Sequence, residues 1–359
     1  MLAYIIRRLL LIVPTMFGIM LINFAIVQFA PGGPVDQMIA KIQGQTVSAT
    51  AGISGGGREV SGGGPEATYR GARGLDPDFI KQLEKLYGFD KPAPERFWLM
   101  MKSYVKFDFG TSFYRDRSVI DLVLDKMPVS ISLGLWSTLL AYFISIPLGI
   151  KKAVRDGEPF DIWTSAAIIV GYAIPVFLFA ILLIIVFAGG SYFNWFPLRG
   201  LVSDNWHDLA WPARIADYFW HLVLPVAALT VGSFATLTML TKNSFLEEIN
   251  KQYVLTARAK GLSQRQVLYG HIFRNGMLLV VSGFPGAFLT ILFTGNLLIE
   301  VIFSLDGLGL LSYESVINRD YPVVFGTLFF FSLVGLIVAI IRDVTYILVD
   351  PRISFERRG

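Results

Sequence analysis

The sequence of 359 residues contains no cysteine and few charged side chains. Disulfides, thiolate metal sites and cysteine nucleophiles are therefore excluded. Charged residues make up 16% of the chain, whereas soluble domains carry about 25%. Because 54% of the residues are hydrophobic and the mean hydropathy is +0.57, the composition is that of an integral membrane protein.

Catalytic motifs are also missing. The three histidines, His207, His221 and His271, are far apart, and none forms the paired-histidine motif of a metalloprotease helix. The chain has no phosphate-binding loop of the Gly-x-x-x-x-Gly-Lys-Ser/Thr type, and no Gly-x-Ser-x-Gly elbow lies in an apolar segment. We therefore expect no enzyme activity, no cofactor and no metal in this chain. The pI of about 9.1 is attributed to the Lys and Arg residues that set membrane topology, so no nucleic-acid partner is expected.

Long apolar runs predict an all-α membrane protein with about six transmembrane helices, since about 20 apolar residues cross the roughly 30 Å hydrocarbon core. The predicted spans are 9–29, 129–150, 162–188, 222–241, 277–300 and 323–348. They divide the chain into an N-terminal transmembrane helix (1–30), an external segment (31–128), a transmembrane core (129–348) and a tail (349–359).

The positions of Lys and Arg predict the orientation. The two short loops assigned to the outside contain only Arg199, Arg214 and Arg319, whereas the segments on the other side contain most of the remaining cations. By the positive-inside rule, both termini are expected in the cytoplasm, together with the loop 242–276.

The external segment 31–128 is predicted to be a helical insertion between the first two spans. Residues 44–74 are rich in Gly and Ser and are expected to form a flexible tether. Amphipathic helices are predicted over 77–87, from Pro94 onward, and from Ser118 until Pro128 breaks the third one.

Helix breakers within the predicted spans are Pro175 in the third and Gly283, Pro285 and Gly286 in the fifth. Such residues fit a bundle with an internal path, but they are also common in ordinary membrane helices.

Ionisable residues within spans are sparse. Glu300, Arg342 and Asp343 lie close enough to a predicted interface for their charges to reach water. No carboxylate lies near the middle of a span, where proton-coupled carriers usually place one. A neutral path could be lined by Tyr142, Ser233, Thr290 and Asn296, although most such residues join helices. The chain therefore has a possible path but no energy source of its own.

A short polar helix–turn–helix lies between two long apolar segments. Helix 252–260 is predicted to end at Gly261 in the left-handed conformation, with Leu262 as the accompanying apolar contact. Ser263 and Gln266 form a capping box for the next helix. A slim, basic helix of this kind suits docking to a soluble partner. An ordinary solvated loop is the alternative.

Within this loop, Tyr253–Gly261 (YVLTARAKG) resembles the coupling motif of ABC importer permeases of the oligopeptide, dipeptide and nickel branch. The resemblance extends along the whole chain. Further matching motifs are IRRLLLIVP (6–14), APGGP (30–34), DFG (108–110), IPLG (146–149), EVIFSLDGLG (300–309) and RDYP (319–322). Within that branch the chain resembles permeases of microcin C and peptide importers, on the motifs YRG (69–71), GLDP (74–77), GFDKP (88–92), GLWS (134–137) and LTKNSF (240–245).

The resemblance implies a type I ABC importer permease fold in a bacterial inner membrane. It implies a second permease subunit, an ABC ATPase, a periplasmic peptide-binding protein and membrane lipid as partners, with oligopeptides as cargo. The ATPase-coupling residues implied are Tyr253, Thr256, Ala257, Arg258, Lys260, Gly261 and Ser263; those of the external loop are Glu300, Asp306, Gly307, Gly309, Arg319 and Asp320.

The sequence departs from the family pattern at two places. Leu255 and Thr256 stand where the general importer motif has Glu and Ala, and Asp306 stands where the branch usually has proline. A nickel or dipeptide permease of the same family is an alternative interpretation. A self-sufficient secondary carrier would require a carboxylate near mid-span and inverted repeats, and neither is found in the sequence.

Overall fold

The computed structural model describes residues 2–29, 81, 90–190, 192–293 and 297–349. Regular structure within these ranges is helical, apart from one isolated bridge between Thr111 and Ser118. Two compact units can be distinguished. The first comprises Met1–Ile5, Lys126–Leu310 and Gly335–Gly359, and the second comprises Ile6–Asp125 and Leu311–Val334.

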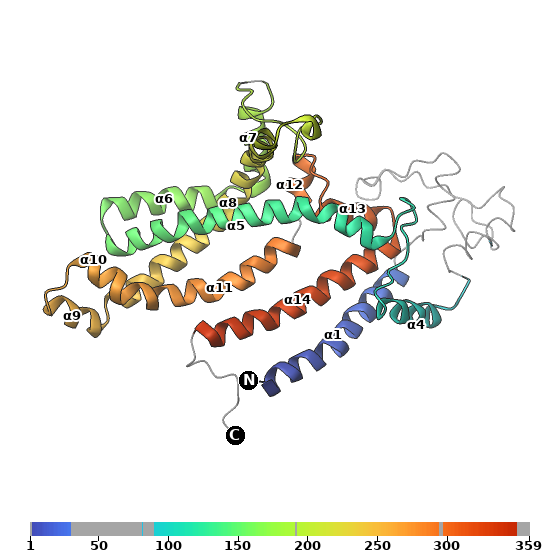
Figure 1. Cartoon of the computed structure of the whole chain (residues 1–359), viewed down its shortest axis with the longest axis horizontal. Helices are drawn as coiled ribbons and strands as arrows, with labels where there is room; N and C mark the ends of the chain where they lie inside the picture. The colour runs from blue at the N-terminus through green and yellow to red at the C-terminus, as the bar shows by residue number, and fades with distance from the viewer. Residues whose placement is uncertain (1, 30–80, 82–89, 191, 294–296, 350–359) are drawn as a thin grey trace. The chain divides into compact units, whose positions relative to one another are not determined.

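Four helices in the described ranges are long and apolar enough to cross a membrane. They are α1 (Leu2–Phe29), α5 (Val119–Val154), α8 (Trp211–Ile249) and α14 (Tyr321–Val349). A fifth span is formed if the bent pair α6 (Pro159–Ala173) and α7 (Val176–Phe187) is counted as one. Helix α11 (Phe273–Phe293) covers the first part of the predicted span 277–300 (Figure 1). The expectation of an all-α membrane protein is confirmed.

The remaining described elements are short. They are α4 (Ala93–Tyr104), the 3-10 turn η1 (Trp206–Asp208), α9 (Gln252–Ala259), α10 (Gln264–Val267), the π-helical turn η2 (Leu268–Ile272), α12 (Leu297–Ile302) and α13 (Leu308–Ile317).

The predicted break at Pro175 is confirmed, because α6 and α7 meet there at 95°. At 283–286 the alternative of ordinary membrane-helix residues applies, because α11 runs through them without interruption. The break predicted at Pro128 is wrong, because α5 runs through it. Leu122 before this proline and Leu133 after it are both about 98% buried (1% and 2% exposed), so packing on either side holds the helix together.

The described part of the predicted external segment, up to Asp125, belongs to the second unit. Helix α4 confirms the prediction of a helix near Pro94. Its Phe97 is buried and packs against Phe17 and Phe24 of α1, with ring centroids 5.5 and 5.3 Å away. The proposed tether 44–74 and nearly all of the predicted helix 77–87 lie outside the described residues.

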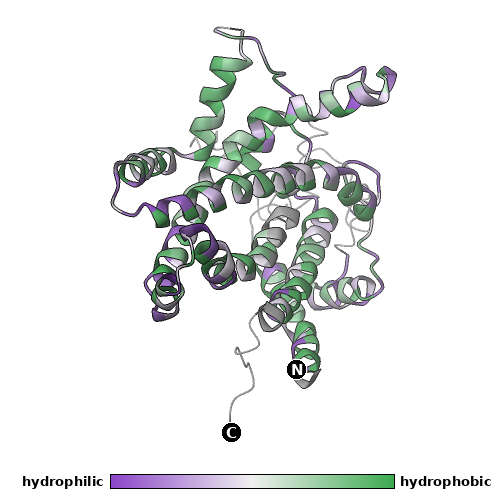
Figure 2. Cartoon of the chain, turned by 60° about the vertical axis from the view of Figure 1, so that its left-hand side comes forward, coloured by the Kyte–Doolittle hydropathy of each residue, from purple (hydrophilic) through white to green (hydrophobic). Residues whose placement is uncertain are grey.

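The first unit contains two apolar clusters. One joins α5, α7, α8 and α12 around Leu133, Ala180 and Ile299. The other joins the ends of α5 and α8 to the short helices that follow α8. Hydrophobic colour runs along most of the long helices in Figure 2, whereas hydrophilic colour is concentrated at turns and helix ends.

Candidate functional site

Helix α9 ends as the sequence predicts. Gly261 has φ +82°, and its N–H donates to the Arg258 carbonyl at 2.9 Å. The N–H of Leu262 donates to the Ala257 carbonyl at 3.4 Å. These two bonds form a Schellman motif, which satisfies carbonyl groups that would otherwise be left free at the helix end. The local sequence therefore determines where α9 ends.

The next helix, α10, begins with the predicted capping box. Gln266 N–H donates to Ser263 Oγ at 3.4 Å, while Ser263 N–H donates to Gln266 Oε1 at 2.9 Å. The chain then continues through η2 into α11. Two capped helix termini thus surround a four-residue turn (260–263), which fixes the direction of α9.

One face of α9 is buried within the chain itself. Val254 is fully buried and Ala257 is 5% exposed, and both pack with Phe245 of α8 and with Ile150 and Ala153 of α5. The small side chain of Ala257 therefore permits a close approach between α9 and its own unit. The structure does not place Ala257 on the surface that a partner could reach.

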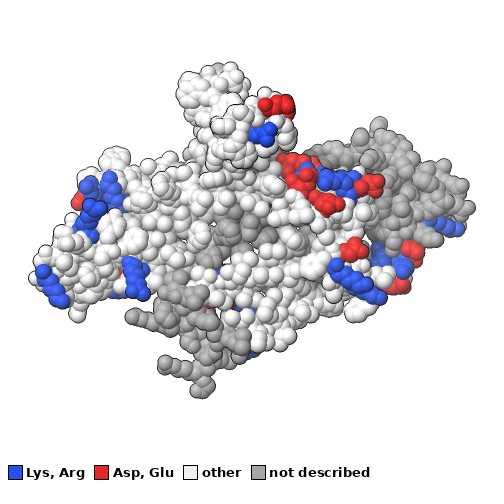
Figure 3. Space-filling model, in the orientation of Figure 1, with Lys and Arg blue, Asp and Glu red and all other residues white. Residues whose placement is uncertain are grey.

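The opposite face of α9 is open. Leu255 is 60% exposed, and Thr256, Arg258 and Lys260 are also exposed. Thr256 Oγ1 donates to the Gln252 carbonyl at 3.1 Å, so its hydroxyl is used within the helix. Figure 3 shows Lys and Arg side chains where α9 lies in Figure 1. This exposed face combines one apolar side chain with two cations.

Tyr253 fastens the start of α9 to the end of α8. Its hydroxyl donates to Glu248 Oε2 at 2.6 Å, and Lys251 pairs with the same carboxylate. Burial, followed by the bond to Glu248, raises the pKa of Tyr253 above its ordinary value. The predicted coupling residue Tyr253 therefore holds the helix in place.

A hollow of about 450 Å³ lies beside the capping box. Its lining residues are Ser263, Arg265, Gln266 and Tyr269. The Tyr269 side chain is 58% exposed. An exposed aromatic ring and a guanidinium group next to α9 extend the surface available to a protein partner.

The charge of Glu300 was expected to reach water at a membrane interface, and this expectation is wrong. The residue is fully buried in the first unit, where Ser130 Oγ donates to its Oε1 at 2.9 Å and Leu310 N–H to its Oε2 at 2.8 Å. The N–H of Gly309 also donates to this carboxylate. Three donors take the place of water, so burial of the side chain is tolerated.

The loop around Glu300 leaves no room at Gly307. A Cβ atom there would lie 2.5 Å from Glu300 Cδ, which is far below van der Waals contact. Asp306 next to it is largely exposed, with 59% of its side chain accessible, and pairs with Lys126. The four predicted external-loop residues at 300–309 thus form one local structure.

Arg319 and Asp320 belong to the second unit. Arg319 has φ +54° and follows α13, and Asp320 directly precedes α14. Asp320 accepts hydrogen bonds from Ser112 Oγ and from Phe113 N–H, the latter at 3.1 Å. Burial raises the pKa of Asp320, although these hydrogen bonds oppose the shift. The carboxylate ties residues 112–113 to the start of α14.

The structure describes the side chains of only two of the four proposed path residues, Tyr142 and Ser233. Tyr142 of α5 packs edge-on against Phe284 of α11, with ring centroids 5.2 Å apart. Ser233 of α8 is exposed. The side chain of Thr290 and the whole of Asn296 lie outside the described residues.

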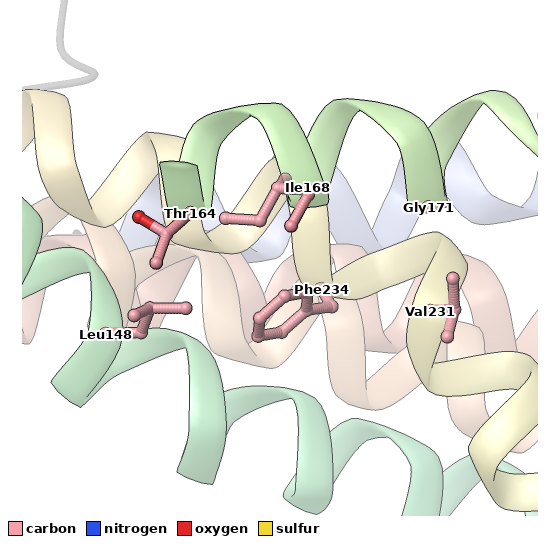
Figure 4. A pocket seen from close by; sticks show the side chains of 7 residues that line it. Leu148, Thr164, Ile168, Gly171, Val231 and Phe234 are labelled. Atoms are coloured by element: carbon pink, nitrogen blue, oxygen red, sulfur yellow. The ribbon is translucent and has the colours of Figure 1, made fainter. Parts of the chain in front are cut away.

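An apolar pocket of about 300 Å³ lies between α5, α6 and α8 (Figure 4). Leu148, Ile168 and Phe234 line it, and Thr164 contributes the one hydroxyl group. That hydroxyl donates to the Phe160 carbonyl at 2.6 Å, so it is already satisfied.

Sequence reasoning missed a buried group of charges near the pocket. Lys152 of α5 is fully buried, and Lys242 of α8 lies 2.7 Å from Asp161 of α6. Asp156, in the turn between α5 and α6, is half-exposed and also lies 2.7 Å from Lys242. We call Lys152, Asp156, Asp161 and Lys242 the ion cluster. Lys152 and Lys242 were interpreted only as topology signals, and Asp161 was overlooked because it immediately precedes the predicted span 162–188. The available signal in the sequence was the position of these two lysines and one aspartate at the ends of three predicted spans.

The charge of Asp343 was likewise expected to reach water, and this is wrong. It is 5% exposed and accepts a hydrogen bond from the Tyr4 hydroxyl at 2.9 Å. No group of three potential His, Asp or Glu metal ligands occurs in the described ranges.

Comparison with known proteins adds independent evidence. A family model described as "binding-protein-dependent transport system inner membrane component" matches residues 145–355. The chain is 64% identical to the "peptidoglycan transport system permease protein YejB" of Agrobacterium fabrum over 360 residues, 99% of each chain. It is 59% identical to the "inner membrane ABC transporter permease protein YejB" of Escherichia coli O157:H7, covering 99% of this chain and 100% of the relative. It is 33% identical to the "oligopeptide transport system permease protein AppB" of Bacillus subtilis, with the same coverage.

Proposed function

This chain belongs to the family of binding-protein-dependent transport system inner membrane components, and we propose that it is the permease through which an ATP-driven importer moves peptides into the cytoplasm. The observation that carries the proposal is the structure of α9. It is a rigid, capped helix with one face packed on its own unit and the other, basic face open. Such a helix can transmit force from a partner that binds the open face.

The partner proposed for α9 is an ABC ATPase of the YejF type. The complete importer would further contain a second permease of the YejE type and a periplasmic peptide-binding protein of the YejA type. In this arrangement both termini and α9 lie in the cytoplasm, as the distribution of Lys and Arg indicates. ATP hydrolysis takes place in the ATPase subunit.

The proposed cargo is an oligopeptide. The names of the relatives support this class, since one transports oligopeptides and another transports peptidoglycan, whose fragments carry short peptides. Microcin C-like peptides belong to the same chemical class. The sequence contains no cysteine and only three histidines, far apart, which favours peptide cargo over nickel.

Capture of the ATPase by the full-length permease in detergent tests the coupling role. Leu255→Asp places a charge on the exposed face of α9 without entering the apolar cluster. A residue at the centre of a docking surface contributes about 2 kcal/mol, so binding should weaken by about 30-fold. Wild-type protein should retain the ATPase.

Val105→Asp is the matched control, because Val105 is 74% exposed and lies in the segment assigned to the other side of the membrane. It should not change ATPase capture. If wild-type protein captures no ATPase, or if Leu255→Asp captures it as well as wild type does, α9 is not the coupling helix. Uptake that persists without ATP but stops when the proton gradient collapses would instead indicate a secondary carrier.

A further inference from the structure

We propose that Asp161 is a positioning residue that fastens the α5–α6 turn to α8, so that α9 and the adjoining ends of α5, α6 and α8 move as one body. The inference rests on the proposed coupling function and identifies how motion of α9 reaches the spans. It concerns the ion cluster, which lies apart from the exposed face of α9.

One carboxylate connects three helices. Asp161 lies in the first turn of α6, and its Oδ2 is 2.7 Å from Lys242 Nζ of α8. Its Oδ1 is 2.9 Å from Lys152 Nζ, near the end of α5. Gly157 N–H, in the turn between α5 and α6, donates to Oδ2 at 3.2 Å. No movement of α6 relative to α5 or α8 can occur here without stretching one of these contacts.

The orientation of Lys152 is fixed as well. Its ammonium group has three protons to donate. The Asp161 carbonyl, Thr164 Oγ1 and Ser165 Oγ lie 2.9, 2.9 and 2.7 Å from Nζ, and all three belong to α6. The side chain of Lys152 is fully buried, so water cannot replace these acceptors. The end of α5 is thereby tied to the first two turns of α6.

Stability alone is a poor explanation for such a cluster. Buried ion pairs lose favourable hydration, and apolar side chains of similar size often stabilise a protein equally well. Directional contacts, in contrast, define one relative position of the helices they join. The geometry therefore points to positioning.

The neighbouring packing shows why α6 needs this attachment. Helices α5 and α8 touch directly, since a Cβ atom on Gly149 would lie 2.6 Å from Thr241 Cβ. Ile150 and Ala153 of α5 also pack with α9 in the apolar cluster, to which α6 contributes no described residue. Farther along α6, the pocket in Figure 4 separates part of its surface from α5 and α8. The ion cluster thus adds directional contacts to the packing of α6 on α8 and connects α6 to the α9 assembly.

The first test compares the number of peptides transported per ATP hydrolysed in the reconstituted importer. Asp161→Asn removes the negative charge that lies 2.7 Å from Lys242 and 2.9 Å from Lys152, while Asp156 remains 2.7 Å from Lys242. Coupling free energies commonly correspond to factors of 5–150, so we expect transport per ATP to fall by about five- to tenfold while ATPase capture is unchanged. Glu158→Gln is the matched control, because Glu158 lies in the same turn, is 56% exposed and is 4.0 Å from its partner Arg155.

A second test measures the position of α6 directly in the full-length protein in lipid nanodiscs. The chain has no cysteine, so spin labels can be attached at Trp163→Cys in α6 and Leu255→Cys in α9. Both side chains are exposed, at 76% and 60%. The distance distribution should be narrow with native Asp161, broader with Asp161→Asn and unchanged with Glu158→Gln. A role in stability alone would lower the melting temperature without broadening the distribution.

Lys242 provides an independent variant if Asp161→Asn does not insert. Lys242→Arg retains the charge and should preserve the narrow distribution, whereas Lys242→Met should broaden it. If the charge-removing variants show the same distance distribution and the same number of peptides transported per ATP as the wild type, the inference is refuted. Absence of ATPase from wild-type preparations would refute the proposed function instead, and the spin-label measurement would still decide the role of Asp161.

Discussion

Glu300→Gln tests whether the buried carboxylate organises the loop that follows α12. Ser130 Oγ and Leu310 N–H donate to its two oxygens at 2.9 and 2.8 Å. Glutamine keeps the shape but has one oxygen, so one donor must face an NH₂ group. Ser130 Oγ already accepts the Leu308 N–H at 2.9 Å, which limits its ability to adapt.

The expected loss of stability follows from the one hydrogen bond that glutamine cannot accept. One hydrogen bond to a charged acceptor is worth about 1.5–3 kcal/mol, so we expect Glu300→Gln to destabilise the protein by about 2 kcal/mol. For a chain of this size, each kcal/mol corresponds to roughly 1–2 °C, which gives a decrease in melting temperature of about 2–4 °C. The chain contains seven tryptophans, so intrinsic fluorescence of the purified protein in detergent can follow the transition.

Asp306→Asn is the matched control from the same loop. It removes a carboxylate whose side chain is 59% exposed and whose partner is Lys126. Surface ion pairs contribute about 0–1 kcal/mol, so the shift should be within about 1–2 °C. If Glu300→Gln has the same melting temperature as the wild type, the carboxylate does not hold the loop and the hydrogen-bond argument is refuted.

Two further predictions concern α9. Gly261→Ala should destabilise the turn by about 1–2 kcal/mol, because φ is +82° although no atom would obstruct the new Cβ; Gly270→Ala, also unobstructed and without positive φ, should not. Melting temperatures and hydrogen exchange in α9 distinguish the two, and equal effects would contradict the conformational argument. The raised pKa of Tyr253 means that its contribution is complete below about pH 10 and is lost as pH rises through the folded-state pKa. Tyr253→Phe should therefore show a shallower loss of stability in alkali than wild type, and an unchanged slope would exclude Tyr253 as the cause.

Local signals in the sequence were reliable where a few adjacent residues decide the conformation. The left-handed Gly261 and the capping box of Ser263 and Gln266 were predicted because these motifs satisfy backbone groups within the segment itself. The bend at Pro175 has the same local origin. Pro128 did not break α5, because buried residues on both sides of it outweigh one lost backbone hydrogen bond.

Contacts between residues far apart in the sequence could not be predicted in this way. Ala257 was assigned to a partner contact, but packing of α9 on α5 and α8 buries it within the chain. The charges of Glu300 and Asp343 were expected to reach water, but both side chains are buried. Their partners Ser130 and Tyr4 are distant in the sequence, so these contacts could not be predicted from it.

The sequence by itself determined that this is an all-α membrane protein of a transport family, with a capped basic helix as its candidate coupling element. Apolar run length, charge distribution and local capping motifs suffice for that, because each acts within one segment. Only the tertiary structure decided which face of α9 is open and that Lys152, Asp161 and Lys242 meet. The physical reason is that burial and ion pairing depend on which helices are neighbours, and no single segment specifies its neighbours.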